Sequence, residues 1–161
     1  MKILRYPDPI LTSTSEGGLM LTPDEYNTML ELMYESSGVG LAAPQVGISK
    51  RCFVMDSSCG EDARSMMIVN DPTYEPVGEK LSLSDEGCLS LPGITAPVER
   101  LSEIRVTYTD QNGNKVEKNL CGIESIIFQH ELDHLDGVLF IDKLMPSHRR
   151  HLVKRYRESG T

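Results

Sequence analysis

Residues 129–135, with the sequence QHELDHL, carry the residue types of a metal-dependent hydrolase. His130 and His134 stand four apart, so on a helix both side chains point from one face and can hold one metal ion. Glu131 follows the first histidine and is close enough to reach water at that ion. This HExxH arrangement can make a nucleophile from water at neutral pH. It supplies two protein ligands, so a third must come from elsewhere in the chain.

The third ligand can lie downstream or upstream of this motif. Many HExxH metalloproteases are completed by a further histidine or acid downstream. The downstream candidates here are His148 and His151, on a basic tail, and Asp142, whose neighbours do not resemble a site. Upstream, Cys88 lies in the sequence EGCLS of residues 86–90. The usual role of a lone cysteine is that of a buried structural thiol.

Three features favour Cys88 as the missing ligand. It follows Gly87, which allows another backbone to approach closely; it stands beside the acid Glu86; and the site lacks one ligand. The remaining cysteines have no comparable context. With no CxxC pair and no export signal, we expect them to be free thiols or metal ligands rather than disulfides: Cys52, Cys59 and Cys121.

Length and composition predict one domain over residues 1–161, large enough to bury a core. Hydrophobic residues make up 39% and charged residues 25%, which is typical of a soluble globular protein. The formal charge of −8 argues against DNA or other nucleic acid as the main partner. No apolar run is long enough to span a membrane, and no signal or transit segment is visible. We therefore expect a cytoplasmic protein, or a mature organellar form without its targeting segment.

The order of the expected elements indicates an α+β domain with antiparallel sheets. Residues up to 18 are expected to be an extended arm and loop, and a helix begins after Thr22 and ends at Gly38. Residues 52–55 and 67–69 predict strands, and residues 73–83 another one or two. Alternation around the turn at residues 112–113 predicts a hairpin over residues 104–120. A helix then runs from about 122 to 135 and presents its histidines inward.

Residues 38–47, GVGLAAPQVG, are too rich in glycine for a helix and too apolar for a solvated loop. Taken alone they predict a buried turn packed under the sheet, because small residues allow close backbone approach. The tail from residue 145 to 159 predicts a short helix with Leu152, Val153 and Tyr156 partly buried. Its basic side chains are either a solvated face or a surface that docks onto ribosomal RNA. They are Arg149, Arg150, Lys154, Arg155 and Arg157.

The three stretches GVGLAAPQ (38–45), EGCLS (86–90) and QHELDHL (129–135) together resemble, in order and spacing, the signature stretches of peptide deformylase. The resemblance covers most of the chain. It implies a metal bound by Cys88, His130 and His134 with water in the fourth position. In the family this metal is Fe²⁺ in the cell, and Zn²⁺, Ni²⁺ or Co²⁺ can replace it; the ligand set alone does not choose among them.

The resemblance also implies the reaction and the roles of several residues. The substrate would be the formyl-methionine at the start of a nascent polypeptide, and formate the product. Glu131 would act as general base, while the Gln45 side chain and the Leu89 backbone N–H would stabilise the oxyanion. The peptide would lie as an added strand beside Val39, Gly40 and Gly87. The methionine pocket would be lined by Val39, Ile123, Ile126, Ile127 and the ring of His130.

Several positions near this pocket are open to more than one interpretation. Arg100 could orient Glu86 or bind the peptide, and a plain surface arginine is an equal alternative. The isoleucines could equally be ordinary helix packing. Ser84, four residues before Cys88, is polar where the family more often carries a larger apolar residue, and this bears on the pocket's depth.

Two other classes of function fit the HExxH helix by itself. A general metallopeptidase would cleave internal bonds of unformylated peptides, but the cysteine and the lack of a downstream ligand argue against it. A non-catalytic metal-binding or ribosome-associated domain would need a fourth protein ligand to close the site. None is apparent, and Glu131 and Gln45 would then have no purpose.

Overall fold

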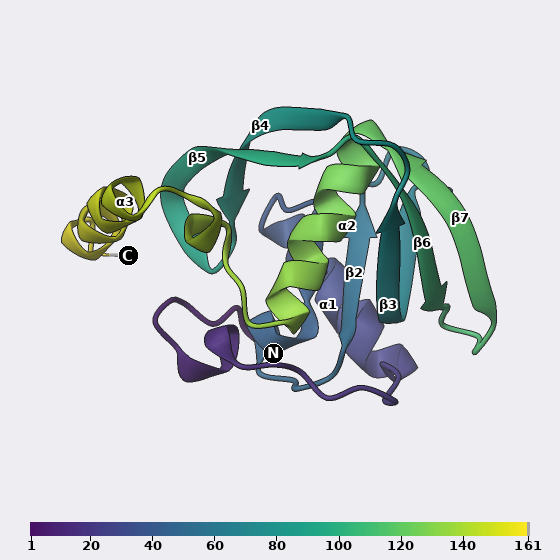
Figure 1. The fold of residues 1–161 in the computed structure, drawn as a ribbon. Coiled ribbons are helices and arrows are strands. Elements are labelled where there is room, and N and C mark those ends of the chain that lie inside the picture. The colour runs from purple at the N-terminus through teal and green to yellow at the C-terminus, as the bar shows by residue number, and fades with distance from the viewer. Residues whose placement is uncertain (161) are drawn as a thin grey trace.

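Short runs of apolar and β-branched residues build an antiparallel sheet in the computed structural model, which describes residues 1–160 (Figure 1). Five strands lie in the order β1-β2-β3-β6-β7, and β4 and β5 pair separately. The predicted α+β class is confirmed. The strands are β1 (Gly40–Ala42), β2 (Cys52–Asp56), β3 (Met66–Pro76), β4 (Leu81–Cys88), β5 (Leu91–Leu101), β6 (Glu103–Thr109) and β7 (Lys115–Cys121).

Helix α2 (Gly122–Leu135) carries the HExxH motif and lies across one face of the five-stranded sheet (Figure 1). The helix predicted from about 122 to 135 is confirmed. Phe128 fixes it to the sheet, because its ring meets that of Phe53 edge-on with 5.1 Å between centroids. Both rings are fully buried in a core shared with β3, β6 and β7. The helix therefore holds its histidines at a depth set by sheet packing.

The opposite face of the sheet is covered by α1 (Pro23–Glu35). Its start is confirmed: the Thr22 hydroxyl accepts from the Glu25 N–H, and the Glu25 carboxylate accepts from the Thr22 N–H. The predicted end at Gly38 is wrong by three residues. The helix stops at Glu35, and Ser37 takes a left-handed conformation with φ 55°.

The two-stranded sheet of β4 and β5 arches over α2 (Figure 1). Only part of this hairpin was expected, because Pro92, Gly93 and Pro97 mask the alternation in β5. Proline is tolerated there since one edge of β5 has no strand beside it. Inward residues of β5 pack against α3 (Pro146–Glu158), where the predicted burial of Leu152, Val153 and Tyr156 is confirmed.

Residues 38–47 differ from the buried turn expected for them. Gly40–Ala42 pair with β2 as an edge strand, and a 3₁₀ turn follows as η2 (Ala43–Val46). Glycine content hid the strand. The arm before residue 18 contains another such turn, η1 (Pro9–Thr12), and η3 (Phe140–Lys143) joins α2 to α3. The hairpin of β6 and β7 is confirmed, with Gly113 at φ 83° in its turn.

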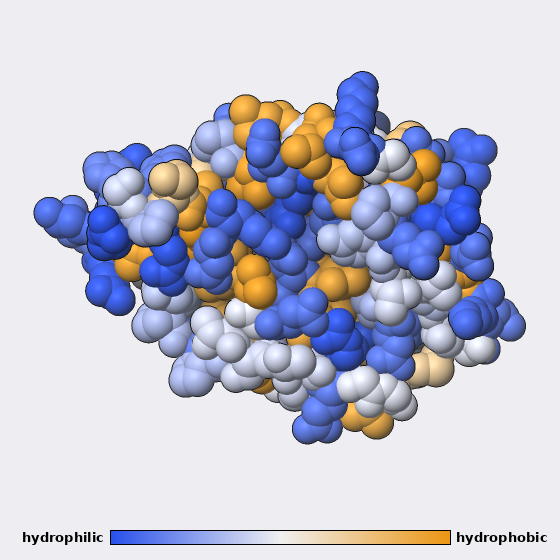
Figure 2. Space-filling model, viewed as in Figure 1, coloured by the Kyte–Doolittle hydropathy of each residue, from blue (hydrophilic) through white to orange (hydrophobic). Residues whose placement is uncertain are grey.

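The outer face of β4 leaves Leu81 and Leu83 in contact with solvent, at 53% and 67% exposure. Figure 2 shows apolar surface over this strand and a mainly hydrophilic surface over α3. No helix within residues 1–160 has the length and apolar character needed to cross a membrane.

Candidate metal centre and active site

Cys88, His130 and His134 come together although they belong to different elements. One potential ligand atom from each lies within 4.8 Å of the others. The Cys88 Sγ is 3.3 Å from the His134 Nε2, and the two imidazole centroids are 5.0 Å apart. Cys88 ends β4, while the histidines occupy consecutive turns of α2. The residue that sequence context selected as third ligand therefore lies beside the other two.

The donor set fits a divalent transition metal. A thiol and two imidazoles are the ligands such ions prefer. Burial and the neighbouring His130 hold the pKa of His134 well below its usual value, so its ring is neutral, as ligation requires. Within residues 1–160 the buried His134 Nδ1 and Glu131 Oε2 have no hydrogen-bond partner. Unpartnered buried polar atoms are uncommon. These two belong to a metal ligand and to the residue after the other histidine ligand, and the others found within residues 1–160 are the hydroxyls of Ser15 and Ser84.

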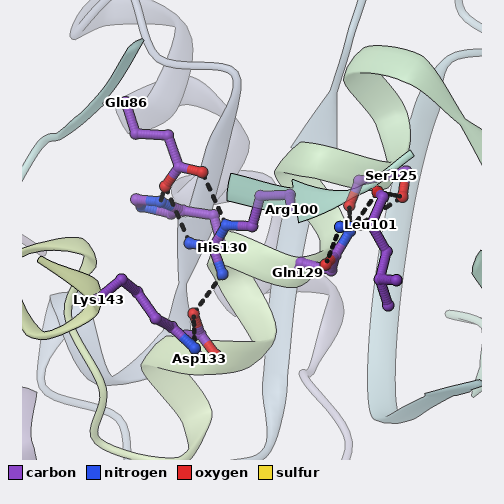
Figure 3. A network of polar contacts seen from close by, with 8 residues as sticks. All are labelled: Glu86, Arg100, Leu101, Ser125, Gln129, His130, Asp133 and Lys143. Atoms are coloured by element: carbon purple, nitrogen blue, oxygen red, sulfur yellow. Dashed lines mark hydrogen bonds and ion pairs between the residues drawn. The ribbon is translucent and has the colours of Figure 1, made fainter. Parts of the chain in front are cut away.

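His130 is oriented by a buried network of charges (Figure 3). Its Nδ1 is 2.8 Å from the Glu86 carboxylate, which leaves Nε2 for a metal. Arg100 grips Glu86 with two hydrogen bonds of 2.7 and 2.9 Å and donates a third, of 2.5 Å, to Asp133. Burial alone would raise the pKa of Glu86, but bonds from Arg100 and His130 lower it to about 2. Glu86 is therefore ionised and fixes one imidazole.

Glu131 lies beside the metal ligands, and burial raises its pKa to about 7. A carboxylate with that pKa can both take and return a proton near neutral pH. The absence of a side chain at Gly40 of β1 leaves room for the Glu131 carboxylate. A Cβ at residue 40 would meet the Glu131 carboxylate more closely than real Cβ contacts allow. The glycine is thus required by close approach of β1 to α2.

Gln45 points its amide toward the same centre. Its Oε1 accepts from the Ala42 N–H at 2.8 Å, so its Nε2 faces Cys88 Sγ at 3.4 Å and Ser90 Oγ at 3.2 Å. Both Gln45 and Ser90 are buried. The amide is thereby fixed as a donor next to the ligands.

A cavity of about 650 Å³ opens beside these residues. It is bordered by β1 and β4, the two strands that the signature stretches contribute. Ile127 is buried, whereas Ile123 is 56% exposed and lines the cavity at its rim. Ser84 also lines the cavity. The expected site residues among its lining are Val39, Gly40, Gln45, Gly87, Cys88, Leu89, Ile123, Ile126, Ile127, His130 and Glu131.

Arg100 is absent from the cavity lining found in residues 1–160, which does not support the prediction that it binds substrate. The surface alternative is also wrong, since the residue is 4% exposed. Two of its N–H groups donate to the Glu86 carboxylate, so the interpretation in which it orients Glu86 agrees with its contacts.

A family model described as polypeptide deformylase matches residues 1–150. The chain belongs to the polypeptide deformylase family. The deformylase of Thermotoga maritima is 46% identical over 157 residues, which are 96% of this chain and 93% of that one. The crystal structure of the Legionella pneumophila deformylase is similar with a TM-score of 0.90 at 31% identity, covering 99% of this chain and 94% of that one. The crystal structure of the Plasmodium falciparum deformylase is similar with a TM-score of 0.88 at 41% identity, and the match covers 98% of this chain and 94% of that one.

Sequence reasoning missed three polar residues that support the site. Ser90 orients Gln45, while Asp133 and Gln129 attach α2 to β5. Asp133 and Gln129 stand inside the QHELDHL stretch, so their place beside the ligands was a usable signal. Their partners were not visible, because those partners lie about thirty residues earlier in the chain.

Replacing Arg100 tests the buried network of Glu86, Arg100 and Asp133. Arg100→Met leaves the Glu86 carboxylate without its guanidinium, and breaking such a pair typically costs about 3–5 kcal/mol. We expect a loss of that order in the free energy of unfolding of the metal-free protein, measured by urea titration. Arg100→Lys should lose less, because it keeps the charge but not the two-pronged contact. Arg64→Met, at a side chain 91% exposed, is the control; a loss no larger than this control's would contradict the network's role.

Proposed function

We propose that this protein removes the formyl group from the N-terminal formyl-methionine of newly made polypeptides and releases formate. The observation that carries the proposal is a three-ligand group beside the unpartnered carboxylate oxygen of Glu131, on one cavity. Three protein ligands leave a four-coordinate ion one open position, as in catalytic rather than structural sites. The family to which the chain belongs supports the formyl amide as the bond that is attacked.

Cys88, His130 and His134 would hold one divalent ion, which when bound supplies Lewis-acid chemistry that acidifies water and polarises a carbonyl. We propose Fe²⁺ as the ion in the cell, as the resemblance to the family implies. The thiolate also suits zinc, nickel and cobalt. Metal analysis of protein purified without oxygen tests the choice, and a full complement of zinc would contradict it.

Glu131 carries the proton transfers in this proposal. Its Oε2 takes a proton from the attacking water and later gives it to the leaving amine. Burial keeps the carboxylate away from competing partners and gives it a pKa of about 7. The same group can therefore act first as base and then as acid without a second residue.

Negative charge that develops on the formyl oxygen needs donors already in place. The Gln45 amide is held toward the centre by its bonds to Ala42 and Ser90, and the Leu89 backbone follows Cys88 directly. We assign the Gln45 Nε2 and the Leu89 N–H to this role. Removing one such donor commonly costs ~3 kcal/mol of barrier.

The peptide would enter between two strand edges. β1 is an edge strand of the five-stranded sheet, and β4 pairs with β5 alone. Both strands border the cavity. An extended peptide can pair with free backbone groups there, near Gly40 and Gly87, without its side chains being read. The methionine side chain would pack on Val39, on Ile123, Ile126 and Ile127 of α2, and on the ring of His130.

This proposal places the enzyme where polypeptides are being made, in the cytoplasm or the corresponding organelle compartment. We also propose a weak contact between ribosomal RNA and the exposed basic face of α3, which keeps only its apolar side chains buried. Figure 2 shows this end of the molecule as mainly hydrophilic. Salt-dependent cosedimentation with ribosomes is expected, and its absence at low salt would contradict the contact.

Glu131→Gln tests the assigned base. The amide keeps the shape but cannot take a proton, and a general base commonly contributes about 10²–10⁴-fold to rate. We expect formate release from formyl-Met-Ala-Ser to fall by that order while one metal ion per chain is retained. Glu117→Gln, at an exposed acid of β7, should leave release unchanged. A fully active Glu131→Gln protein would refute the assignment.

Gly40→Ala tests the close approach of β1 to Glu131. The added methyl meets the end of a side chain rather than backbone, so the carboxylate is displaced and the fold is kept. Misplacing a catalytic group by about 1 Å can cost on the order of 100-fold in rate. We expect a loss of that size in kcat, with metal content and urea midpoint close to those of Gly17→Ala, where the nearest neighbour of a Cβ is 3.3 Å away. Unchanged kcat would show that Glu131 does not need its observed position.

A further inference from the structure

Helix α2 carries a second row of polar side chains beside its histidines. Ser125, Gln129 and Asp133 stand four apart and therefore form a line along one side of the helix. His130 and His134 form the adjacent line, about 100° further around. None of the three residues in the second row lines the cavity described within residues 1–160. They contact the end of β5 instead (Figure 3).

The Gln129 side-chain amide makes the two backbone hydrogen bonds that a neighbouring strand would make with Leu101. Its Oε1 accepts from the Leu101 N–H at 3.1 Å, and its Nε2 donates to the Leu101 carbonyl at 2.9 Å. The Ser125 hydroxyl donates to the same carbonyl at 2.8 Å and accepts from the Gln129 Nε2 at 3.0 Å. Gln129 is 4% exposed. Both backbone groups of one β5 residue are thus bound by side chains of α2.

Asp133 binds the preceding residue of β5. Its carboxylate accepts from Arg100 at 2.5 Å and lies 3.2 Å from the Lys143 ammonium. Arg100 in turn holds Glu86 of β4, which contacts His130. Two successive residues of β5 are therefore fixed by residues one helical turn apart on α2, as Figure 3 shows.

These contacts matter because the metal ligands belong to different parts of the fold. β4, which ends at Cys88, pairs only with β5, and no strand ladder within residues 1–160 joins this pair to the other sheet. The histidines sit on α2. The separation between thiol and imidazoles therefore depends on how α2 is fixed to β4 and β5. Gln129 is the residue next to His130 and makes the backbone part of that attachment.

We propose that Gln129 is a positioning residue for the metal centre: through Leu101, and together with Asp133 through Arg100, it sets the placement of Cys88 relative to His130 and His134. The proposal rests on the metal ligands assigned under the proposed function. On this proposal the Gln129 amide contributes to metal binding by fixing the geometry of the ligands. A buried amide that served packing alone would contribute to stability and leave metal binding unaltered.

Gln129→Leu removes the amide while roughly keeping its volume. Partners of metal ligands typically contribute 10–100-fold to metal affinity. We expect the dissociation constant for Zn²⁺, measured by competition with a chromophoric chelator, to rise at least about tenfold. We also expect the visible absorption spectrum of the Co²⁺-loaded protein to change in band position or intensity, since that spectrum reports coordination geometry.

Asn70→Leu is the matched control. Asn70 is likewise a fully buried amide that joins backbone segments, accepting from the Leu21 N–H at 2.9 Å and donating to the Thr109 carbonyl at 3.1 Å, but it lies in β3 outside the cavity lining. It should lower the urea midpoint and leave Zn²⁺ affinity and the Co²⁺ spectrum unchanged. Ser125→Ala deletes one hydrogen bond to Leu101 and replaces Gln129→Leu in the test if that variant does not fold. We expect it to raise the dissociation constant for Zn²⁺ by between twofold and tenfold.

The proposal is overturned if folded Gln129→Leu, or Ser125→Ala in its place, binds Zn²⁺ within twofold of the unaltered protein with the same Co²⁺ spectrum. It is equally overturned if Asn70→Leu weakens Zn²⁺ binding as much, because the effect would then follow from lost stability. None of these readouts uses a formylated peptide. A protein that binds metal as described but releases no formate would refute the proposed function and leave this inference standing.

Discussion

The structure depends on one constraint: a thiol from a two-stranded sheet must meet two imidazoles from a helix that packs on a different sheet. Cys88 lies at the end of β4, and the histidines lie on α2, whose depth is fixed by Phe128 against the five-stranded sheet. The two sheets share no ladder within the described residues. The ligands nonetheless lie within 4.8 Å of one another. Side-chain contacts of α2 with β4 and β5 satisfy this constraint.

Those contacts are made of charges and amides in a buried region, where each unpaired group would be costly. Arg100 donates hydrogen bonds to the Glu86 and Asp133 carboxylates, and Gln129 binds both backbone groups of Leu101. Glu131 Oε2 has no partner within residues 1–160, and neither does the Nδ1 of the nearby His134. Burial, which makes pairing necessary in the network, also raises the pKa of the Glu131 carboxylate to about 7. The hydrogen bonds of Glu86, Arg100 and Gln129 thus hold the ligands in place, while the Glu131 carboxylate keeps an oxygen available for proton transfer.

The sequence was sufficient where a residue's role depends on its neighbours in the chain. The bounds of α2, the start of α1 and the choice of Cys88 follow from local context, and so does the family. It was insufficient where the role depends on a distant partner. β1 reads as a turn because Gly40 is required by Glu131, which is ninety-one positions away. The prolines of β5, which an edge strand tolerates, hide its alternation. The sequence leaves the role of Arg100 open between orienting Glu86, binding the peptide and lying at the surface, until Glu86 and Asp133 are seen beside it.

The most direct test of this account is a metal titration of activity. Metal-stripped protein is reloaded with Fe²⁺ without oxygen, and formate release from formyl-Met-Ala-Ser is measured at each ratio of ion to chain. The account predicts no release without metal and a linear rise that saturates at one ion per chain, since the described residues supply one three-ligand group. Release by the metal-stripped protein, or no release at full loading, would contradict it.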